Sequence, residues 1–342
     1  MGLSAGDAWQ LRRYAAMLGE YARVHLLRSG LKLGLIEAMG EPVREGALAS
    51  QMGLDTELLA AWLRAAEAHG LVERCHHPSD AYRSSRHTRW LLESPDRESL
   101  LSLLEQTVST YAPIYDRLPE LLQGEERPAF GAPDEARRAA EISCLIEARA
   151  LDALGRVPGA ADARHVLDIG CGYGTYLSGL LTRYRDAHGV GVELDVDLAE
   201  IARRHLLEAG VSRRSEIWVG DFMALDIAKG TFDLILLNNN LYYFPPEQHV
   251  TLFERALRYL ANGGVLTIQV PVATAKTLPR LAGFTRNTTA FDLFLRAHAN
   301  LYGLPDLEPL HATLREVGFS SVGEANIVPG GAARYVWARA AK

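Results

Sequence analysis

The chain has 342 residues, of which 48% are hydrophobic and 23% charged, the balance of a folded globular protein of two domains. Its 36 basic and 42 acidic residues give a net charge of −6, so no global positive field attracts nucleic acid. No run approaches the roughly 20 apolar residues that span a bilayer, and the segment from Met1 to Tyr14 lacks the apolar core of a secretory signal. Only three scattered cysteines are present, which predicts a cytoplasmic location without a disulfide framework or a zinc site.

The first part of the chain predicts helices followed by a small hairpin. Apolar residues recur at helical spacing from Ala8 to about Met39. Asp55 or Thr56 can cap a later helix that Gly70 ends. Two further helices and two short strands are expected in order at 44–52, 57–69, 71–74 and 82–84. This order is typical of a winged-helix domain, which we place at residues 1–95.

A winged-helix unit can bind DNA, and its second helix then enters the major groove. From Glu57 to His69 this helix carries one arginine and two glutamates, too little positive charge to neutralise several phosphates. It is rich in leucine and alanine and holds a tryptophan, which suits packing against protein. We therefore expect a dimerisation domain and no nucleic-acid partner.

Residues 96–155 predict a helical connector. Helices are expected from Leu100 to Leu122 and from Glu135 to Leu154, on either side of a polar loop that contains prolines. The aromatic residues Tyr111, Tyr115 and Phe130 can cover the space between two domains or line a substrate pocket. The sequence favours the covering role for any single one of them, and the connector as a whole is expected to contribute to the pocket.

From His165 the pattern changes to short apolar runs that alternate with amphipathic helices, which is typical of a parallel sheet covered on both faces. Parallel strands are expected at 165–169, 189–193, 216–219, 232–237 and 265–270. A closing hairpin is expected at 322–328 and 334–339. Residues 156–342 thus predict an α/β fold with a Rossmann-like sheet of seven strands.

The turn after the first of these strands carries Asp168-x-Gly170-x-Gly172-x-Gly174. Glycines allow the backbone to turn sharply and approach a ligand, and the following helix offers free N–H groups. A dinucleotide-binding loop would have a third glycine at position 175, where this chain has threonine. Asp168 would repel a pyrophosphate but suits a cofactor that carries an ammonium group.

Two further acids follow the next strands. Glu193 ends the second strand, where it can accept hydrogen bonds from both hydroxyls of a ribose. Asp221 follows the third strand and can accept from an adenine amino group. The C-terminal ends of parallel strands meet at one edge of the sheet, so we expect Asp168, Glu193 and Asp221 to line one crevice.

These motifs, with Gly220-Asp221-Phe222 and the turn Asn262-Gly263-Gly264, resemble class I S-adenosylmethionine-dependent methyltransferases. With its winged-helix unit, the whole chain resembles the plant-type and bacterial small-molecule O-methyltransferases. The resemblance implies a homodimer with interlocked N-terminal domains. It also implies that the glycine loop and Asp168 hold the methionine part of the cofactor, Glu193 the ribose, and Asp221 with Phe222 the adenine.

The chain departs from that family after the fourth strand. The family has a His-Asp-Trp stretch there, whose histidine deprotonates the substrate hydroxyl, and Tyr242 stands in its place here. Tyrosine has a reference pKa of about 10 and is a poor base at neutral pH. We therefore expect an acceptor that needs little deprotonation: an amine, a carboxylate, an acidic phenol or an activated carbon.

Two other residues are candidates for the site. His298 lies in the insertion after the fifth strand, where the family builds part of its substrate pocket, and could replace the missing base. Asn238 closes the fourth strand with Asn239 and Asn240, and of the three it is the residue expected to reach the cofactor. The histidines show no recognisable metal-ligand spacing, so no metal site is predicted.

The sequence thus predicts a dimeric enzyme that transfers a methyl group from S-adenosylmethionine to a small organic acceptor, of the kind found in natural-product metabolism. It leaves O-, N- and C-methylation open. One alternative is a cofactor-sensing transcriptional regulator or non-catalytic dimer. Another is a repurposed enzyme that binds S-adenosylmethionine for chemistry other than methyl transfer.

Overall fold

The computed structural model describes residues 5–76, 80–272, 282–328 and 331–342, and it divides the chain into two units, Met1–Glu105 and Gln106–Lys342. No helix of the described residues is both long and apolar enough to cross a membrane.

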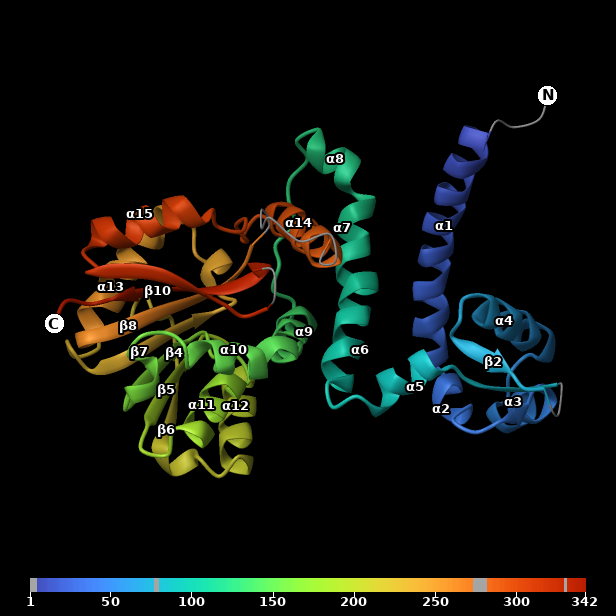
Figure 1. The fold of residues 1–342 in the computed structure, drawn as a ribbon, viewed down its shortest axis with the longest axis horizontal. Coiled ribbons are helices and arrows are strands. Elements are labelled where there is room, and N and C mark those ends of the chain that lie inside the picture. The colour runs from blue at the N-terminus through green and yellow to red at the C-terminus, as the bar shows by residue number, and fades with distance from the viewer. Residues whose placement is uncertain (1–4, 77–79, 273–281, 329–330) are drawn as a thin grey trace. The chain divides into compact units, whose positions relative to one another are not determined.

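The N-terminal unit consists of helices and a three-stranded sheet with the order β1-β3-β2 (Figure 1). Its elements are α1 (Ala5–Lys32), α2 (Leu35–Ala38), β1 (Val43–Arg44), α3 (Glu45–Met52), α4 (Thr56–Ala68), β2 (Val72–Arg74), β3 (Ala81–Ser84) and α5 (Arg86–Glu93). Helix α6 (Arg97–Gln106) follows, and its last residue is the first of the C-terminal unit. The predicted order of helix, turn, helix and hairpin is present. Strand β1 was not predicted, because two residues are too few for a period-2 pattern, and pairing of Val43 with Tyr82 defines it.

Local chemistry sets the boundaries of these helices. Asp55 accepts a hydrogen bond from the Leu58 amide at 2.7 Å and so caps α4, as expected. Gly34 adopts a φ of +72°, a conformation that favours glycine, and it divides the helical segment predicted from Ala8 to about Met39 into α1 and α2. Leu35, Ile36, Leu48 and Leu63 are buried in the core of the unit.

The C-terminal unit is built on a seven-stranded sheet with the order β6-β5-β4-β7-β8-β10-β9. Its strands are β4 (His165–Ile169), β5 (His188–Glu193), β6 (Ser215–Val219), β7 (Phe232–Asn238), β8 (Leu260–Pro271), β9 (Ser321–Asn326) and β10 (Ala333–Arg339). The first five strands in the sheet are parallel, and β10 pairs antiparallel with both β8 and β9. This is the predicted seven-stranded α/β sheet with its closing hairpin.

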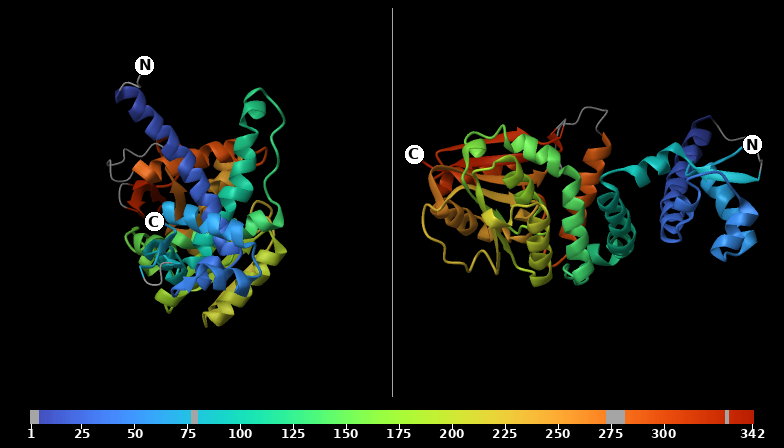
Figure 2. Two further views of the ribbon diagram at one scale, coloured as in Figure 1. Left: turned by 90° about the vertical axis from the view of Figure 1, so that its right-hand side faces the viewer. Right: turned by 90° about the horizontal axis from the view of Figure 1, so that it is seen from below.

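Helices cover both faces of this sheet (Figures 1 and 2). One buried cluster joins the sheet to α10 (Glu147–Leu154), α11 (Thr175–Arg183) and α12 (Val196–Glu208). A second cluster joins the opposite face to α13 (His249–Tyr259) and α15 (Leu307–Val317). The central strands β4 and β7 are largely buried for this reason, and most of their residues are apolar.

Strand β8 differs from its prediction. It begins at Leu260 rather than Val265, so the predicted turn at 262–264 lies inside the strand. The pairing of β7 with β8 is irregular between Phe232 and Leu234, and Gly263 has a φ of +74°. A bulge of this kind keeps the strand paired while the glycine turns the backbone.

The segment before the sheet is helical, as predicted, but it is broken. A π-helical turn, Thr107–Tyr111, follows α6 and precedes α7 (Ala112–Asp116) and α8 (Leu118–Leu122). The second predicted helix consists of α9 (Pro133–Ser143), a 3-10 turn and α10. Helix α14 (Ala282–Arg296) lies in the insertion after β8.

Candidate active site

The glycine loop connects β4 to α11 and folds over the end of β5. The amides of Gly170 and Cys171 both donate to the carbonyl of Val192, at 2.8 and 3.0 Å. Gly170, Gly172 and Gly174 all have positive φ values, between +53° and +68°. A Cβ atom on Gly170 would lie 1.8 Å from Nδ2 of Asn240, so a larger residue at this position would require the Asn240 side chain to move.

Asp168 lies at the end of β4 with only 2% of its surface exposed. Its Oδ1 atom is buried and has no hydrogen-bond partner among the described residues. Burial, with a smaller effect from the nearby Glu193 and Glu147 carboxylates, raises the pKa of Asp168 to about 8. An unpaired buried carboxyl group of this kind is complementary to a cation that enters from the cavity.

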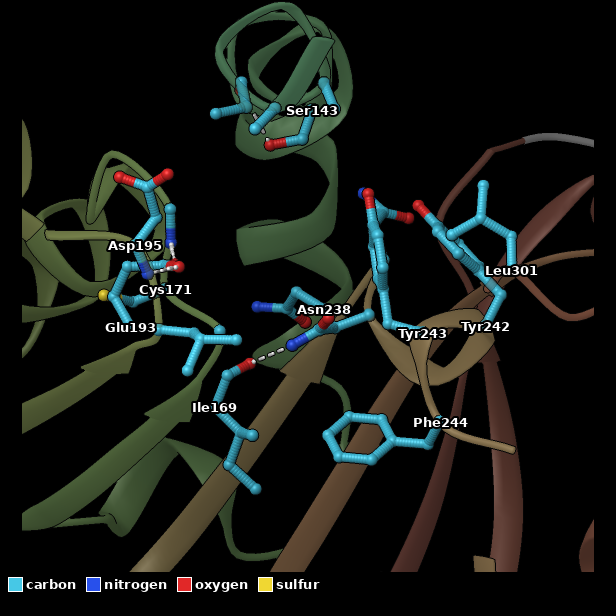
Figure 3. A pocket seen from close by; sticks show the side chains of 18 of the residues that line it. Ser143, Ile169, Cys171, Glu193, Asp195, Asn238, Tyr242, Tyr243, Phe244 and Leu301 are labelled. Carbon is cyan, nitrogen blue, oxygen red and sulfur yellow. Dashed lines mark hydrogen bonds between the residues drawn. The ribbon is translucent and has the colours of Figure 1, made fainter. Parts of the chain in front are cut away.

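Glu193 is oriented by the backbone around it. Its Oε2 atom accepts from the Gly172 amide at 2.8 Å, and its Oε1 atom accepts from the Asp195 amide at 3.1 Å. Figure 3 shows Glu193 beside Cys171 of the glycine loop. Each carboxylate oxygen has further lone pairs, so the side chain can still accept from a ligand while these bonds hold it in place.

Asp221 and Phe222 follow β6. Oδ1 of Asp221 accepts from the Met223 amide at 2.8 Å, which fixes the turn. Phe222 is buried, and its ring meets that of Tyr259 edge-on with the ring centroids 6.0 Å apart. Both residues line the same cavity as Asp168 and Glu193, so the three acids meet in one place as predicted.

The three asparagines at the end of β7, Asn238 to Asn240, have different roles. Asn240 donates through Nδ2 to the carbonyl of Ile169 at 3.0 Å and occupies the space next to Gly170. Asn239 has a φ of +50° and is the one non-glycine residue of the described chain with a positive φ. Asn238 is 8% exposed, and both polar atoms of its amide are buried without a partner among the described residues. The amide of Asn238 is therefore free to form hydrogen bonds with a ligand. The amide of Asn240 instead holds the start of the glycine loop through its bond to Ile169.

These residues line a cavity of about 1220 Å³. Single small-molecule sites measure roughly 300–1,000 Å³, so this cavity has room for a nucleoside cofactor and a second molecule. In Figure 3, Glu193 and Asp195 lie on one side, Tyr242 and Tyr243 on the other, and Asn238 between them.

The second side of the cavity is aromatic. It is lined by rings from the π-helical turn, the loop before α9, the segment after β7, and α14: Tyr111, Phe130, Tyr242, Tyr243, Phe291 and Phe294. Tyr111 packs on Phe294 with the ring centroids 4.3 Å apart, and Tyr242 meets Phe291 edge-on at 5.5 Å. Asn300 holds the Phe130 backbone by two hydrogen bonds of 2.7 Å. Tyr111 and Phe130 therefore line the cavity, where the sequence had favoured a covering role for each residue. Tyr115 packs against Tyr111 and is not among the lining residues.

Tyr242 and Tyr243 line the cavity, whereas the other candidate base, His298, does not. Burial, with smaller effects from Tyr243 and Tyr111, raises the pKa of Tyr242 well above its ordinary value. The pKa of Tyr243 is raised to about 12 by burial and by the carboxylates of Glu193 and Glu135. His298 is 3% exposed and is not among the lining residues, because the rings of Phe130 and Phe294 pack against it.

The His298 ring is also held from within its own segment. Nδ1 of His298 lies 2.8 Å from the carbonyl of Phe294, and burial lowers its pKa. Its neighbours Asp292 and Arg296 form an ion pair with each other at 3.0 Å. His298 thus packs against the aromatic rings of Phe130 and Phe294 that line the cavity, and does not line the cavity itself.

The residues present fit the cofactor that the sequence predicts. The partnerless Oδ1 of Asp168 suits an ammonium group, the lone pairs of Glu193 suit ribose hydroxyls, and the amide of Asn238 can pair with a polar group between them. Among the described residues, no group of three or more histidine, cysteine, aspartate and glutamate side chains is arranged to hold a metal ion.

Comparisons with known proteins agree with this architecture. Residues 166–264 match the family described as a methyltransferase domain. A trans-aconitate 2-methyltransferase from Delftia acidovorans is 38% identical over 124 residues, which are 36% of this chain and 43% of that protein. The match therefore spans less than half of that relative's length and is confined to part of this chain.

Two solved structures match over the full chain. An O-methyltransferase family protein from Burkholderia thailandensis has a TM-score of 0.78 and 20% identity, and it covers 100% of this chain and 99% of its own. Human N-acetylserotonin methyltransferase, solved with S-adenosylmethionine, has a TM-score of 0.77 and 16% identity, with 100% of both chains covered. At these identities the likeness concerns the fold.

Proposed function

Because residues 166–264 match the family of methyltransferase domains and the fold is that of S-adenosylmethionine-dependent methyltransferases, we propose that this protein transfers a methyl group from S-adenosylmethionine to a small organic acceptor. The observation that supports this most directly is the meeting of Asp168, Glu193, Asp221 and the glycine loop in one cavity. The cofactor supplies an electrophilic methyl group on a sulfonium sulfur.

Different residues of the cavity bind different parts of the cofactor. Asp168 pairs with the ammonium group, Glu193 accepts from the ribose hydroxyls, and Asp221 and Phe222 contact the adenine. Asn238 hydrogen-bonds to the cofactor at the centre of the cavity. The aromatic wall holds the acceptor and excludes water, so the transfer is accelerated by position and desolvation rather than by a protein base. The room beside the cofactor site favours an enzyme over a protein that only senses the cofactor.

Isothermal titration with S-adenosylhomocysteine, followed by mass spectrometry of candidate acceptors incubated with S-adenosylmethionine, tests this function. We expect micromolar binding and a product heavier than its acceptor by one methylene unit. A protein that binds no cofactor at millimolar concentration would disprove the proposal.

Replacing Tyr242 by phenylalanine tests the absence of a protein base. The raised pKa keeps the Tyr242 hydroxyl protonated over the physiological range, so it cannot accept a proton there. We expect Y242F to keep kcat within about threefold of the wild type, with the same pH profile between roughly pH 6 and 9. A fall of kcat of about 100-fold together with the loss of one limb of the profile would assign a proton transfer to Tyr242.

We also propose that the protein is a homodimer joined through α1. Leu11, Tyr14, Leu18 and Tyr21 recur at alternating three- and four-residue spacing, and all are 59–68% exposed. Large apolar side chains in such a stripe form the contact surface of paired helices. The three free cysteines fit the reducing cytoplasm that we propose as its location.

Light scattering after size-exclusion chromatography checks the dimer. We expect the wild type at twice the mass of one chain and L11R/L18R at the monomer mass, because two buried arginines would face an apolar partner helix. Glu20 lies on the opposite face of α1, so E20K is the matched control and should remain dimeric. A monomeric wild type contradicts this proposal.

A further inference from the structure

A row of polar side chains crosses one face of the C-terminal sheet, near the ends of its central strands. Asn238 of β7 pairs with Gln269 of β8, and Gln269 pairs with Tyr335 of β10, so the three side chains lie on the same face. This face otherwise carries the apolar core that joins the sheet to α10 and α11. Gln269 is 1% exposed and is not among the residues that line the cavity. Any effect of Gln269 on a ligand must therefore pass through a neighbouring residue.

That neighbour is Tyr176 of α11. Nε2 of Gln269 donates to the hydroxyl oxygen of Tyr176 at 3.1 Å, and this hydroxyl donates to the carbonyl of Ser143 at 3.1 Å. Because Gln269 supplies the donor of the first bond, the hydroxyl hydrogen of Tyr176 stays available for the second. Tyr176 and Ser143 both line the cavity. The two bonds thus connect the interior of the sheet to the cavity wall.

Stability alone does not account for a glutamine at this place. The Oε1 atom of Gln269 is buried without a hydrogen-bond partner among the described residues. Leaving a buried acceptor unpaired costs more than one neutral hydrogen bond contributes, so an apolar side chain of similar length would suit the core better. A residue that breaks such a rule without a gain in packing is expected where function requires it.

Ser143 is the last residue of α9, and this helix packs on the glycine loop. A Cβ atom on Gly172 would lie 3.5 Å from the Cβ atom of Ala140 on α9. The hydroxyl of Tyr173 in the loop lies 3.2 Å from Oε1 of Glu141 on α9 and donates to it. The proposed function places the amino-acid end of the cofactor at this loop and its adenosine end at the ends of β5 and β6. The position of α9 therefore bears on the amino-acid end first.

We propose that Gln269 is a positioning residue for the amino-acid end of the cofactor: through the hydroxyl of Tyr176 it holds the end of α9 against the glycine loop. The inference rests on the proposed function, since it concerns how the same site holds its cofactor. The hydrogen bonds from Gln269 to Tyr176 and from Tyr176 to Ser143 fix how closely α9 approaches the loop. The groups that bind the adenosine end do not depend on these two bonds.

Titration calorimetry of the full-length protein with two probes tests the proposal. S-adenosylhomocysteine has both ends of the cofactor, whereas 5′-methylthioadenosine has the nucleoside and the sulfur without the amino-acid group. Q269M keeps the length of the side chain and removes its polar atoms, and Y176F removes only the hydroxyl. Each variant should bind S-adenosylhomocysteine about fivefold to tenfold more weakly than the wild type, the effect of one or two neutral hydrogen bonds. The affinity for 5′-methylthioadenosine should stay within about twofold of the wild type.

The double variant Y176F/Q269M shows whether Gln269 acts through the hydroxyl. It should bind S-adenosylhomocysteine no more weakly than Y176F alone, because Gln269 has no other connection to the cavity once the hydroxyl is gone. Thr267 is buried two residues earlier in β8 and its side chain lies on the same face, so T267V is the matched control. T267V should bind both probes like the wild type. The melting temperature of each variant reports on its folding.

Three outcomes overturn the proposal. Equal weakening of both probes by Q269M or by Y176F would make these residues a structural part of the core. Unchanged binding of S-adenosylhomocysteine by both single variants would remove them from the site, and additive losses in the double variant would show that Gln269 does not act through Tyr176. A wild type that binds neither probe is a different result, since it disproves the proposed function itself.

Discussion

D168N is expected to make the ligand-free protein more stable while it weakens binding of the cofactor by roughly 100-fold, the effect of losing a buried charge-assisted contact. Asp168 has a pKa of about 8 in the folded protein, far above that of an aspartate in an unfolded chain. The folded state therefore holds a proton that the unfolded state releases. Asparagine has nearly the same shape and no charge, so it removes this penalty.

The sign of the pH dependence follows from this difference. The stability of the wild type falls as pH rises from the unfolded pKa of about 4 towards the folded pKa of about 8, by up to ~1.4 kcal/mol per pH unit. Above about pH 8 the stability lost through Asp168 no longer changes with pH. The melting temperature of D168N should exceed that of the wild type by a margin that grows up to pH 8, as thermal unfolding scans from pH 5 to 9 can measure.

Calorimetry provides an independent check of Asp168. Binding of an ammonium group beside Asp168 should drive its ionisation, so at pH 7 the wild type should release close to one proton when the cofactor binds. The observed heat then changes with the ionisation enthalpy of the buffer. D168N should show a smaller buffer dependence, and equal proton release in both proteins would contradict the assignment.

The sequence was sufficient to predict the sheet and the acidic side of the cavity. Strand β4 has the predicted bounds, because the short apolar run of a buried parallel strand is a clear pattern. Asp168, Glu193 and Asp221 were placed together because parallel strands end at one edge. The strands follow from local hydrophobic patterns, and the meeting of the acids follows from the order of strands and helices along the chain.

The aromatic side could not be predicted with the same success. Its rings come from segments more than 100 residues apart, such as Tyr111 and Phe294, and no local period connects them. His298 was a candidate base from its place in the insertion, but the orientation of its ring depends on packing against Phe130 and Phe294.

The sequence singled out Asn238 among the three asparagines at the end of β7, and its partnerless amide fits that expectation. The role of Asn240 was beyond the sequence. Asn240 instead pairs with Ile169, a contact that exists only because β4 and β7 are neighbours in the sheet. The glycine at position 170 was predicted for its conformational freedom, and the structure adds that Asn240 leaves no room for a side chain.

G170A is expected to destabilise the protein by about 2–4 kcal/mol and to abolish cofactor binding. The new Cβ atom would lie 1.8 Å from Nδ2 and 2.7 Å from Cγ of Asn240, so the asparagine must leave its hydrogen bond to Ile169. The positive φ of +66° adds backbone strain of about 1–2 kcal/mol. Denaturant unfolding measures the first effect, and titration with S-adenosylhomocysteine measures the second.

The clash and the strain can be separated within this chain. Gly210 has a φ of +70° and nothing within 4 Å of a built Cβ, so G210A reports the strain alone and should cost about 1–2 kcal/mol without any effect on the cofactor. Combining G170A with N240A removes the clashing side chain. The double variant should be less destabilised than the sum of the two single variants by at least about 1 kcal/mol, because N240A relieves what G170A introduces. If the two effects are additive, Asn240 is not the reason that position 170 requires glycine. The cost of G170A would then come from the backbone conformation alone.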